Sequence, residues 1–394
     1  MPKASVVIPC YNAERFVEGT VRSVLGQTMA DFEVVCVDDG STDGTRALLE
    51  GLASEDPRVR VLAQENGGEG PARDAGLKAA QGTWIYCLDA DDLMEPTLLE
   101  EAIACGEQTG ADLVVFRTRL LDDQTGALSD FRWCFDTAWL PEGTTVFDPA
   151  AHPDHILNSF QNWVHNKLLR ASFVHEHDLG FQHVHRTADL LFTCRALTEA
   201  RRIALLDRPL HRYRVNNPQS ALFTSDLYPL DFYEAFLELR RELERRGTWE
   251  LYHLSYVNWA VEGVAGNLER ARSPKSFALI ADTMRAEGLE RLDIPTLARE
   301  DSYNVTQWDV CQAIAETSGE ELPLRLIRVL CEQGDRLGAL IEQVVAERDR
   351  TVRERDAEIE RLRHYNEDLR GSVSFKTGRM LTAPLRAVRD MRRA

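Results

Sequence analysis

Short apolar runs alternate with helical patterns over the first third of the chain. The alternation predicts strands at 4–9, 32–39, 59–64, 84–89 and 111–118, with helices at 15–27, 45–53, 70–81 and 96–109 between them. Strands joined by helices over short links are typical of an α/β fold with a mostly parallel sheet covered on both faces. Such sheets bind ligands at the carboxyl ends of their strands. The polar segments that follow the strands are therefore the first candidates for a site.

The pattern changes beyond the fifth predicted strand. Residues 119–222 carry longer loops with many aromatic and histidine side chains, whereas 226–334 have the spacing of helices. Residues 337–370 are highly charged, with apolar positions near a heptad seam at Leu337, Ile341, Val344, Val352, Ile359, Leu362 and Leu369. Arg348, Arg355 and Asn366 interrupt this seam. We expect a short, imperfect coiled coil that could form a homo-oligomer, with a single solvated helix as the alternative.

Composition and charge narrow the class of protein. The 394 residues carry a net charge of −18, which argues against a nucleic-acid-binding protein. The eight cysteines form no CxxC pair, and there is neither a signal-peptide pattern nor a long apolar span, so a cytoplasmic protein is expected. Residues 371–394 form a basic, amphipathic tail with six basic residues and one acid. Such a tail favours the anionic inner face of the cell membrane, or else it is a solvated or partner-docking terminus.

Three carboxylates stand directly after the fourth predicted strand, in the segment LDADD. Asp89, Asp91 and Asp92 are too close together to be stable as free anions without a cation. Acids at a helix start are the simpler interpretation, but one acid would suffice for that purpose. A Mg²⁺ or Mn²⁺ ion that shares its coordination with a diphosphate explains all three.

Two more polar segments end strands two and three. In VDDGSTDGT, Asp38 and Asp39 can accept from a base or a ribose, while the residues behind them cap the next helix. In NGGEGPARDAG, the glycines allow close backbone approach, and Arg73 suits either an ion pair with the acids or a nucleotide phosphate. The glycine spacing matches neither GxGxxG nor a P-loop.

The motifs PCYN, VDDGSTDGT, ENGGEGPARDAGL and LDADD, in this order, resemble the family 2 glycosyltransferases of the GT-A fold. The resemblance covers residues 4–116 strongly and continues more weakly to about Ser220. It implies a GT-A domain over 1–222, and the helical spacing of 226–334 predicts a separate helical domain after it. It also implies a nucleotide-sugar donor, usually a UDP-sugar, bound with Mg²⁺ or Mn²⁺, and inversion at the anomeric carbon. The expected acceptor is a cell-surface glycan or a lipid-linked sugar.

The resemblance also assigns roles to residues. Asp91 would ligate the metal, Asp89 would hold ribose or metal, and His211 is a candidate metal or phosphate contact, with a half-exposed strand histidine as its alternative. Asp92 would orient the metal ligands or the bound sugar. The remaining nucleotide-sugar contacts would be Pro9, Tyr11, Asn12, Asp38, Asp39 and Arg73.

The catalytic base is expected in the segment TADLLF. Related enzymes often carry a Glu-Asp pair there, but this chain has Ala188 in place of the glutamate, which leaves Asp189. One carboxylate is enough to take the proton of an acceptor hydroxyl, so Asp189 is the predicted base; a helix N-cap is its alternative. Because of the missing glutamate, a catalytically weak scaffold or partner subunit stays open as a second hypothesis.

Other interpretations of the motifs are weaker. The histidines of HEH (175–177) and HVH (183–185) lack the further ligands of a zinc site. Lys167 and Arg214 are candidate phosphate or acceptor contacts, and Trp163 is expected to pack in the core. A phosphatase with an early DxD nucleophile, or a phosphoacceptor receiver, would not place its acids after a fourth strand. The absence of a QxxRW motif argues against a processive synthase.

Overall fold

The computed structural model describes residues 1–217, 226–319 and 321–371, without the side chains of 335–345, 347 and 365–371. It divides into two compact units, residues 1–325 and 326–394. The predicted boundary between a GT-A domain and a helical domain near residue 222 falls inside the first unit and stays a prediction. The predicted basic tail lies outside the described residues from 372 onward.

The first unit is built on one ten-stranded mixed sheet with the order β3-β2-β1-β4-β9-β6-β10-β5, to which β7 is added beside β6 and β8 beside β10. The strands are β1 (Ala4–Cys10), β2 (Phe32–Asp39), β3 (Val59–Gln64), β4 (Trp84–Cys87), β5 (Leu93–Met94), β6 (Leu113–Asp122), β7 (Leu128–Asp130), β8 (Val146–Phe147), β9 (Lys167–Arg170) and β10 (Ile203–Val215). The predicted α/β fold is thereby confirmed.

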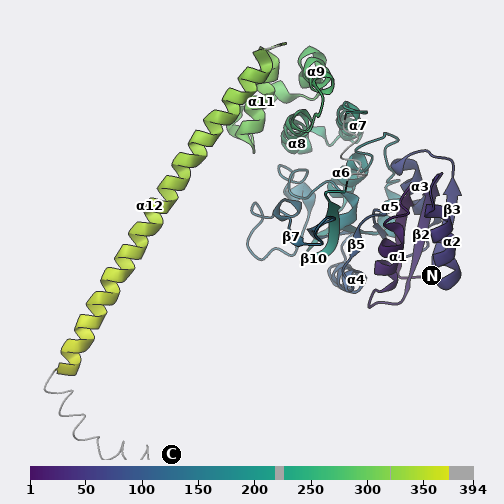
Figure 1. Cartoon of the computed structure of the whole chain (residues 1–394), viewed down its shortest axis with the longest axis horizontal. Coiled ribbons are helices and arrows are strands. Elements are labelled where there is room, and N and C mark those ends of the chain that lie inside the picture. Colours follow the sequence, from purple (N-terminus) through teal and green to yellow (C-terminus); the bar gives the residue numbers. More distant parts are fainter. Residues whose placement is uncertain (218–225, 320, 372–394) are drawn as a thin grey trace, which may run out of the picture. The chain divides into compact units, whose positions relative to one another are not determined.

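Helices cover both faces of the sheet (Figure 1). They are α1 (Val17–Leu25), α2 (Thr45–Glu55), α3 (Glu69–Ala79), α4 (Leu98–Thr109), α5 (Ala171–Glu176) and α6 (Asp189–Glu199). Alternate residues of a strand point to opposite faces, so Val6 and Val34 pack in the large core with α1, α2 and α4. Val35 and Val37 face α3 on the other side. The strands of this half are buried on both faces, which is why they appear as continuous apolar runs.

The sheet departs from the expected parallel arrangement in its second half. The strands β1, β2, β3 and β4 are parallel to one another, as predicted. β9, however, lies antiparallel between β4 and β6. This strand has only four residues, too few for a period to be recognised in the sequence.

β10 is the strand that brings a distant part of the chain to the predicted site. It runs parallel to β6, with register shifts around Pro209, and it pairs antiparallel with β5 at His211 and Arg212. Proline is tolerated in a sheet at such irregularities, and a bulge re-aims the side chains beside it. Because β5 begins directly after the three aspartates, this pairing places His211 beside them.

The rest of the described chain is helical. It forms α7 (Asp231–Arg245), α8 (Trp249–Glu269), α9 (Pro274–Thr283), α10 (Leu289–Arg291), α11 (Val305–Glu316) and α12 (Glu321–Gly371). The predicted coiled-coil segment lies within the continuous helix α12, but its pairing stays a prediction. Within the described ranges, no helix has the combination of length and apolar character needed to cross a bilayer.

Candidate active site

The loops after β1 and β2 are tied to each other by hydrogen bonds. The Asn12 Oδ1 accepts from the Thr42 backbone N–H at 2.8 Å, and the Asn12 N–H donates to the Ser41 Oγ at 3.1 Å. Gly40 has a φ of 71°, and a Cβ there would lie 2.8 Å from the Asn66 backbone nitrogen. Only glycine fits this turn without strain. The segments PCYN and DDGSTD are therefore brought together as predicted for strand ends, with Tyr11 52% exposed beside them and Pro9 partly buried.

Asp39 is committed to holding the glycine-rich segment. Its Oδ1 accepts from Gly67 N–H at 2.9 Å and from the Gln64 amide at 2.7 Å, and its Oδ2 accepts from Gly68 N–H at 2.8 Å. A carboxylate has about four acceptor positions, so few remain for a ligand. The neighbouring Asp38 is also buried, and its Oδ1 accepts from the Ser41 N–H at 3.3 Å.

Arg73 lies on α3 and is buried in a cluster of acids. Its Nη2 donates to the Asp89 Oδ1 at 2.6 Å and also pairs with Glu69. The guanidinium lies over the Phe181 ring. Burial alone would raise the pKa of Asp89, but the Arg73 and His165 side chains hold it well below its usual range. Among the described residues, the Arg73 Nε and Nη1 are buried without a hydrogen-bond partner, so the three N–H groups on these two nitrogens remain for a ligand.

Asp91 and Asp92 are crowded carboxylates whose ionised forms are costly. Burial, together with the charges of Asp92 and Asp89, raises the pKa of Asp91 to about 7. The Asp91 Oδ2 accepts from the Asn217 amide at 3.1 Å. The pKa of Asp92 is raised as well, chiefly because the side chain is fully buried. A divalent cation nearby would remove this penalty, because an opposite charge favours the ionised form.

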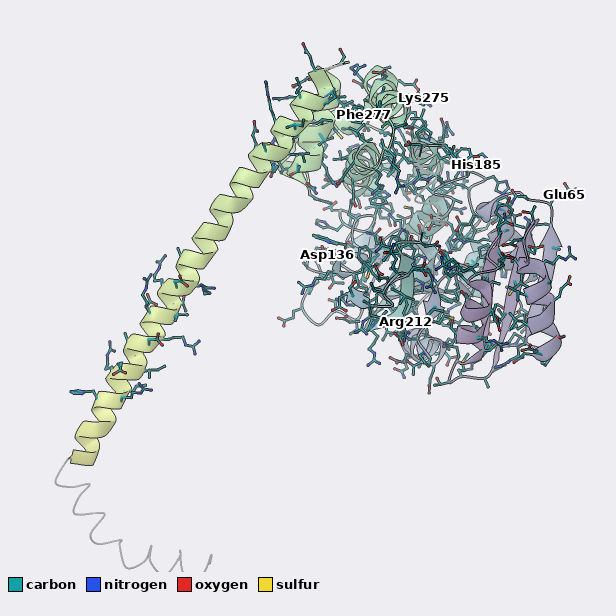
Figure 2. The ribbon with its side chains drawn as sticks, viewed as in Figure 1. Glu65, Asp136, His185, Arg212, Lys275 and Phe277 are labelled. Atoms are coloured by element: carbon teal, nitrogen blue, oxygen red, sulfur yellow. The ribbon has the colours of Figure 1, made fainter. Side chains whose placement is uncertain are left out.

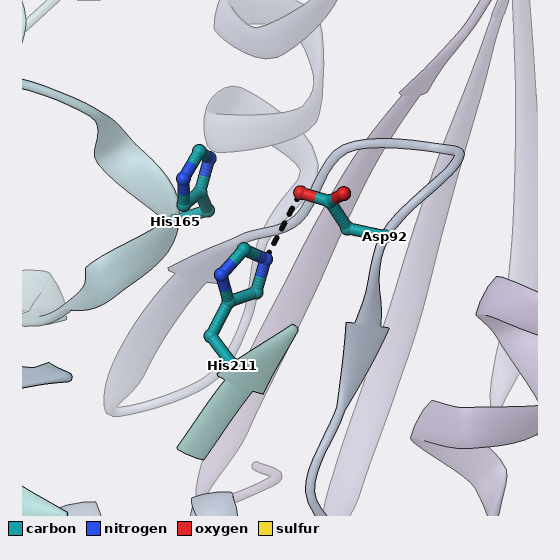
Figure 3. Close-up of side chains that lie close together, drawn as sticks. All are labelled: Asp92, His165 and His211. Atoms are coloured by element: carbon teal, nitrogen blue, oxygen red, sulfur yellow. Dashed lines mark hydrogen bonds and ion pairs between the residues drawn. The ribbon is translucent and has the colours of Figure 1, made fainter. Parts of the chain in front are cut away.

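Two histidines join Asp92 in a buried group (Figure 3). The Asp92 Oδ2 is 3.0 Å from the His211 Nε2, and the Asp92 Oδ1 accepts from the Arg214 backbone N–H at 2.7 Å. The His211 ring stacks on His165 with a centroid separation of 4.3 Å. Burial lowers the pKa of His211 to about 3, so its ring is neutral at pH 7.

This group fits a divalent cation by its chemistry. Asp92, His165 and His211 each offer one ligand atom, and the three atoms lie within 4.8 Å of one another. The His165 Nε2 is buried without a hydrogen-bond partner in the described part of the chain. Carboxylate oxygens and neutral imidazoles together suit Mn²⁺ better than Mg²⁺, which prefers oxygen ligands. Asp89 and Asp91 flank this group, and their predicted roles as metal ligands stay predictions.

Asp189 is the first residue of α6, and the N-cap position belongs to Ala188. Burial raises the pKa of Asp189, against the opposing charge of Arg73. The alternative of a side-chain N-cap has no support here, because the start of α6 has no side-chain cap hydrogen bond. A second carboxylate, Glu69 of α3, reaches the same cluster through its ion pair with Arg73.

One residue of the site, His165, is not predicted from the sequence, and another, Lys167, is predicted with a different role from the one it has in the structure. His165 was not singled out, because a lone histidine in a loosely patterned segment carries no distinguishing signal. Lys167 was considered as a ligand contact, but it is fully buried and organises the preceding loop. Its Nζ donates to the carbonyls of Gln161 and Trp163 at 2.5 and 2.7 Å and to the Asn166 Oδ1 at 2.6 Å. This anchoring holds His165 in the group.

The other candidates have structural partners. Arg214 pairs with Asp123 at 3.0 Å and donates to the Asp91 carbonyl at 2.6 Å. His177 contacts Glu199 at 2.8 Å, and His185 stacks on Tyr228 at 3.9 Å (His185 is labelled in Figure 2). Trp163 is half-buried and stacks between Phe131 and Tyr213.

Comparisons with known proteins agree with this geometry. The family model described as glycosyl transferase family 2 matches residues 5–133. EpsH of Bacillus subtilis, named as a glycosyltransferase, is 32% identical over 311 residues, which cover 74% of this chain and 86% of EpsH. EpsJ of the same organism, also named as a glycosyltransferase, is 32% identical over 223 residues and is covered to 63%.

A further relative is TarS of Staphylococcus aureus, named as a poly(ribitol-phosphate) β-N-acetylglucosaminyltransferase. It is 29% identical over 240 residues, which cover 59% of this chain and 39% of TarS. The chain thus spans less than two thirds of both EpsJ and TarS. The crystal structure of TarS 1–349 with UDP-GlcNAc superposes with a TM-score of 0.60 at 21% identity, covering 85% of this chain and 92% of that one. At this identity the superposition establishes the shared fold.

Proposed function

This chain belongs to the family 2 glycosyltransferases, and on that premise we propose that it is a metal-dependent inverting enzyme. The donor is a nucleotide sugar with UDP as the expected nucleotide. The acceptor is a hydroxyl of a cell-surface glycan or a lipid-linked sugar, reached at the inner face of the cell membrane.

The state of Arg73 is the observation that carries the donor proposal. Two of its guanidinium nitrogens are buried without partners in the described chain, although Asp89 and Glu69 take the third. A buried N–H without a partner costs about 1–3 kcal/mol, and a diphosphate oxygen would remove that cost. Guanidinium groups are well suited to phosphate because of their planar set of donors.

Asp91, with Asp89 and His211, would hold Mg²⁺ or Mn²⁺ beside the diphosphate. When bound, such an ion would neutralise the charge that develops on the departing diphosphate. Asp189 would accept the proton of the acceptor hydroxyl as the acceptor oxygen bonds to C1 of the donor sugar. The bond from C1 to the diphosphate oxygen breaks in the same step, which inverts C1. A pKa raised by burial makes Asp189 a stronger base than a solvated aspartate.

A screen of nucleotide sugars by thermal shift, with and without Mn²⁺, tests donor binding, because a ligand of the native state raises its melting temperature. Hydrolysis of the donor that binds then reports turnover. In Asp91→Ala we expect hydrolysis to fall about 100-fold or more, since loss of the metal removes several kcal/mol of charge stabilisation. The exposed Asp31 provides the control, and Asp31→Ala should behave as the wild type. Equal hydrolysis by Asp91→Ala and the wild type would contradict the assignment.

The replacement of the expected glutamate by Ala188 favours a second candidate. A chain without that acid could bind the donor yet turn it over weakly, as a scaffold or partner subunit of another transferase. Donor binding with Mn²⁺, but no hydrolysis or transfer by the wild type, would support this scaffold. Absence of binding by any nucleotide would contradict both candidates.

A further inference from the structure

A cavity of about 790 Å³ opens in the first unit, and its lining includes none of the aspartates or histidines of the candidate active site. Three separate parts of the chain form its walls: the segment after β7, the segment 155–161, and the helices α8 and α11 with the turn before α11. Asp136, labelled in Figure 2, lies in the first of these walls. A space of this size is within the range of specific small-molecule sites.

Aromatic rings dominate the walls. Trp133 is 77% exposed and Tyr303 is 40% exposed, although large aromatic side chains are normally covered. Tyr303 is held by stacking on His155 at 4.5 Å, and His155 in turn stacks on Trp139 at 5.7 Å. These contacts fix the Tyr303, His155 and Trp139 rings before any ligand arrives, so little conformational entropy of these side chains would be lost on binding.

The polar part of the lining consists mostly of amides. Asn158, Gln161, Asn304 and Gln307 line the cavity beside the rings, and two of them, Asn158 and Asn304, also hydrogen-bond to Ser255 and to the Gln307 N–H. A pyranose ring has the complementary character, because its C–H faces are apolar and its edge carries hydroxyls. Aromatic faces with nearby amides therefore match a sugar better than they match a purely apolar ligand.

The charge of the cavity lining disfavours phosphate-bearing glycans. Its ionisable residues include the acids Asp136 and Glu262, and none of the described lining residues is a lysine or an arginine. Phosphate-bearing polymers are recognised by Arg and Lys, and acids repel them. The lining thus suits uncharged chains and disfavours a polymer such as poly(ribitol phosphate), the acceptor in the name of TarS.

A series of ring contacts connects the cavity with the carboxylate site. Phe131 lines the cavity and stacks on Trp163 at 5.4 Å. Trp163 stacks on Tyr213 at 4.7 Å, and Tyr213 stacks on His165 at 5.3 Å, beside Asp89. A continuous series of packed rings thus joins the cavity to the site, which is the geometric basis for assigning both to one acceptor chain.

We propose that this cavity binds the acceptor glycan at sugars remote from the reacting hydroxyl, and that it selects uncharged hexopyranose chains over phosphate-bearing ones. The inference rests on the glycosyltransferase function proposed above. It adds a binding site and a charge class of acceptor that the donor site does not specify.

The test uses the full chain with cellotetraose and chitotetraose as neutral probes and inorganic polyphosphate as the anionic probe. Binding is followed by saturation-transfer NMR, and UDP binding with Mn²⁺ is followed by thermal shift in the same samples. We expect a neutral tetrasaccharide to bind and Trp133→Ala to weaken its binding at least tenfold, since the indole ring supplies a large apolar contact area. Trp133→Phe, which keeps a ring, should recover part of the affinity.

The control variant is Leu227→Ala, because Leu227 is 70% exposed and is not part of the cavity lining. It should bind the tetrasaccharide as the wild type does. The proposal is overturned if no neutral tetrasaccharide binds, if Trp133→Ala binds as tightly as the wild type, or if polyphosphate binds in preference. UDP binding that persists in these cases leaves the donor site intact, whereas loss of UDP binding alone counts against the proposed function and not against the cavity.

Discussion

The acids of the candidate active site differ in how many of their hydrogen-bond acceptor positions the protein itself fills. Asp39 accepts three hydrogen bonds from its neighbours, so its first role is to shape the glycine-rich segment. Asp91 accepts a hydrogen bond from the Asn217 amide and carries a raised pKa, because burial and two nearby acids oppose its ionisation. A carboxylate that the protein leaves under-compensated is a better candidate for a cation ligand than one already saturated.

Asp189 gives the sharpest prediction at this scale. Asp189→Asn keeps the size and a hydrogen-bonding oxygen but cannot accept a proton, so we expect transfer to fall about 10²–10⁴-fold. Donor binding with Mn²⁺ and the melting temperature should stay near the wild-type values, because the donor contacts are unchanged. The measurement is the rate of transfer at saturating donor, together with the thermal shift by UDP. Transfer within twofold of the wild type would remove Asp189 from the role of base.

At the scale of elements, α3 carries Arg73 of the candidate active site and packs unusually closely against the sheet. A Cβ on Gly76 would lie 2.2 Å from the Val7 Cγ1 and 3.4 Å from the Val37 Cγ2. The absence of a side chain at this position lets the helix lie against β1 and β2, and Arg73 extends from the same helix toward Asp89. The position of the guanidinium thus depends on a contact three residues away along the chain.

Two glycine substitutions with opposite expected signs test this packing. Gly76→Ala should destabilise the fold by about 1–3 kcal/mol, because an added methyl group in a filled space forces backbone or rotamer shifts. Gly51→Ala on α2 is the matched control, since a Cβ there meets nothing within 4 Å. Alanine is the better helix former by about 1 kcal/mol, so this control should be stabilised. Urea unfolding measures both, and equal shifts would show that α3 does not pack as described.

Glu33 joins the beginnings of three elements and makes stability depend on pH. Its Oε1 accepts from the Ser5 Oγ at 2.7 Å and from the Gln81 N–H at 2.6 Å, and its Oε2 accepts from Arg60 at 2.7 Å. Burial alone would raise the pKa of Glu33, but these hydrogen bonds lower it below its ordinary value. The ionised form is therefore more stable in the folded chain than in the unfolded one.

Glu33→Gln is expected to cost about 1.5–3 kcal/mol at pH 7, the usual range for a hydrogen bond to a charged group. A lowered pKa contributes stability that is fully present above the unfolded pKa of about 4.3 and is lost as the pH falls through the folded pKa. The difference in melting temperature between the wild type and Glu33→Gln should accordingly shrink from pH 7 toward pH 4 and below. Glu107→Gln, at an exposed ion pair, should show little difference at any pH. A melting-temperature difference between the wild type and Glu33→Gln that stays constant with pH would contradict a stabilising role of the Glu33 charge.

At the scale of the whole molecule, the helix α12 carries an exposed apolar seam. Within its described side chains, Val352, Ile359 and Leu362 are 47%, 44% and 57% exposed, at the spacing of a heptad seam. An apolar seam on a helix is stabilised when a second helix covers it. We expect the full chain to form a homo-oligomer through this segment.

Light scattering compares the full chain with a chain ending at Gly334. The full chain should have a mass of at least two chains, and the shorter one the mass of a single chain. UDP binding by the shorter chain serves as the control for folding, because the residues of the candidate active site lie within residues 1–325. If both samples contain the same number of chains per particle, α12 is not the oligomerisation element.

The sequence by itself determined the elements of the donor half and the place of its acids. The continuous apolar runs β1 to β4, separated by helical periods and followed by polar motifs, placed Asp38, Asp39, Arg73, Asp89 and Asp91 at strand ends or at the helix start beside them. Such local patterns depend only on residues near in the chain, so no tertiary information was needed to find them.

Only the tertiary structure decided which distant residues complete the candidate active site. β9 and the shifted register of β10 bring His165 and His211 beside Asp92, from 73 and 119 positions away along the chain. It also shows that the Asp39 carboxylate accepts three hydrogen bonds from the protein, while two nitrogens of Arg73 have no partner among the described residues. Strand pairing between remote segments and the satisfaction of buried polar atoms depend on contacts in space, which hydrophobic periodicity does not encode.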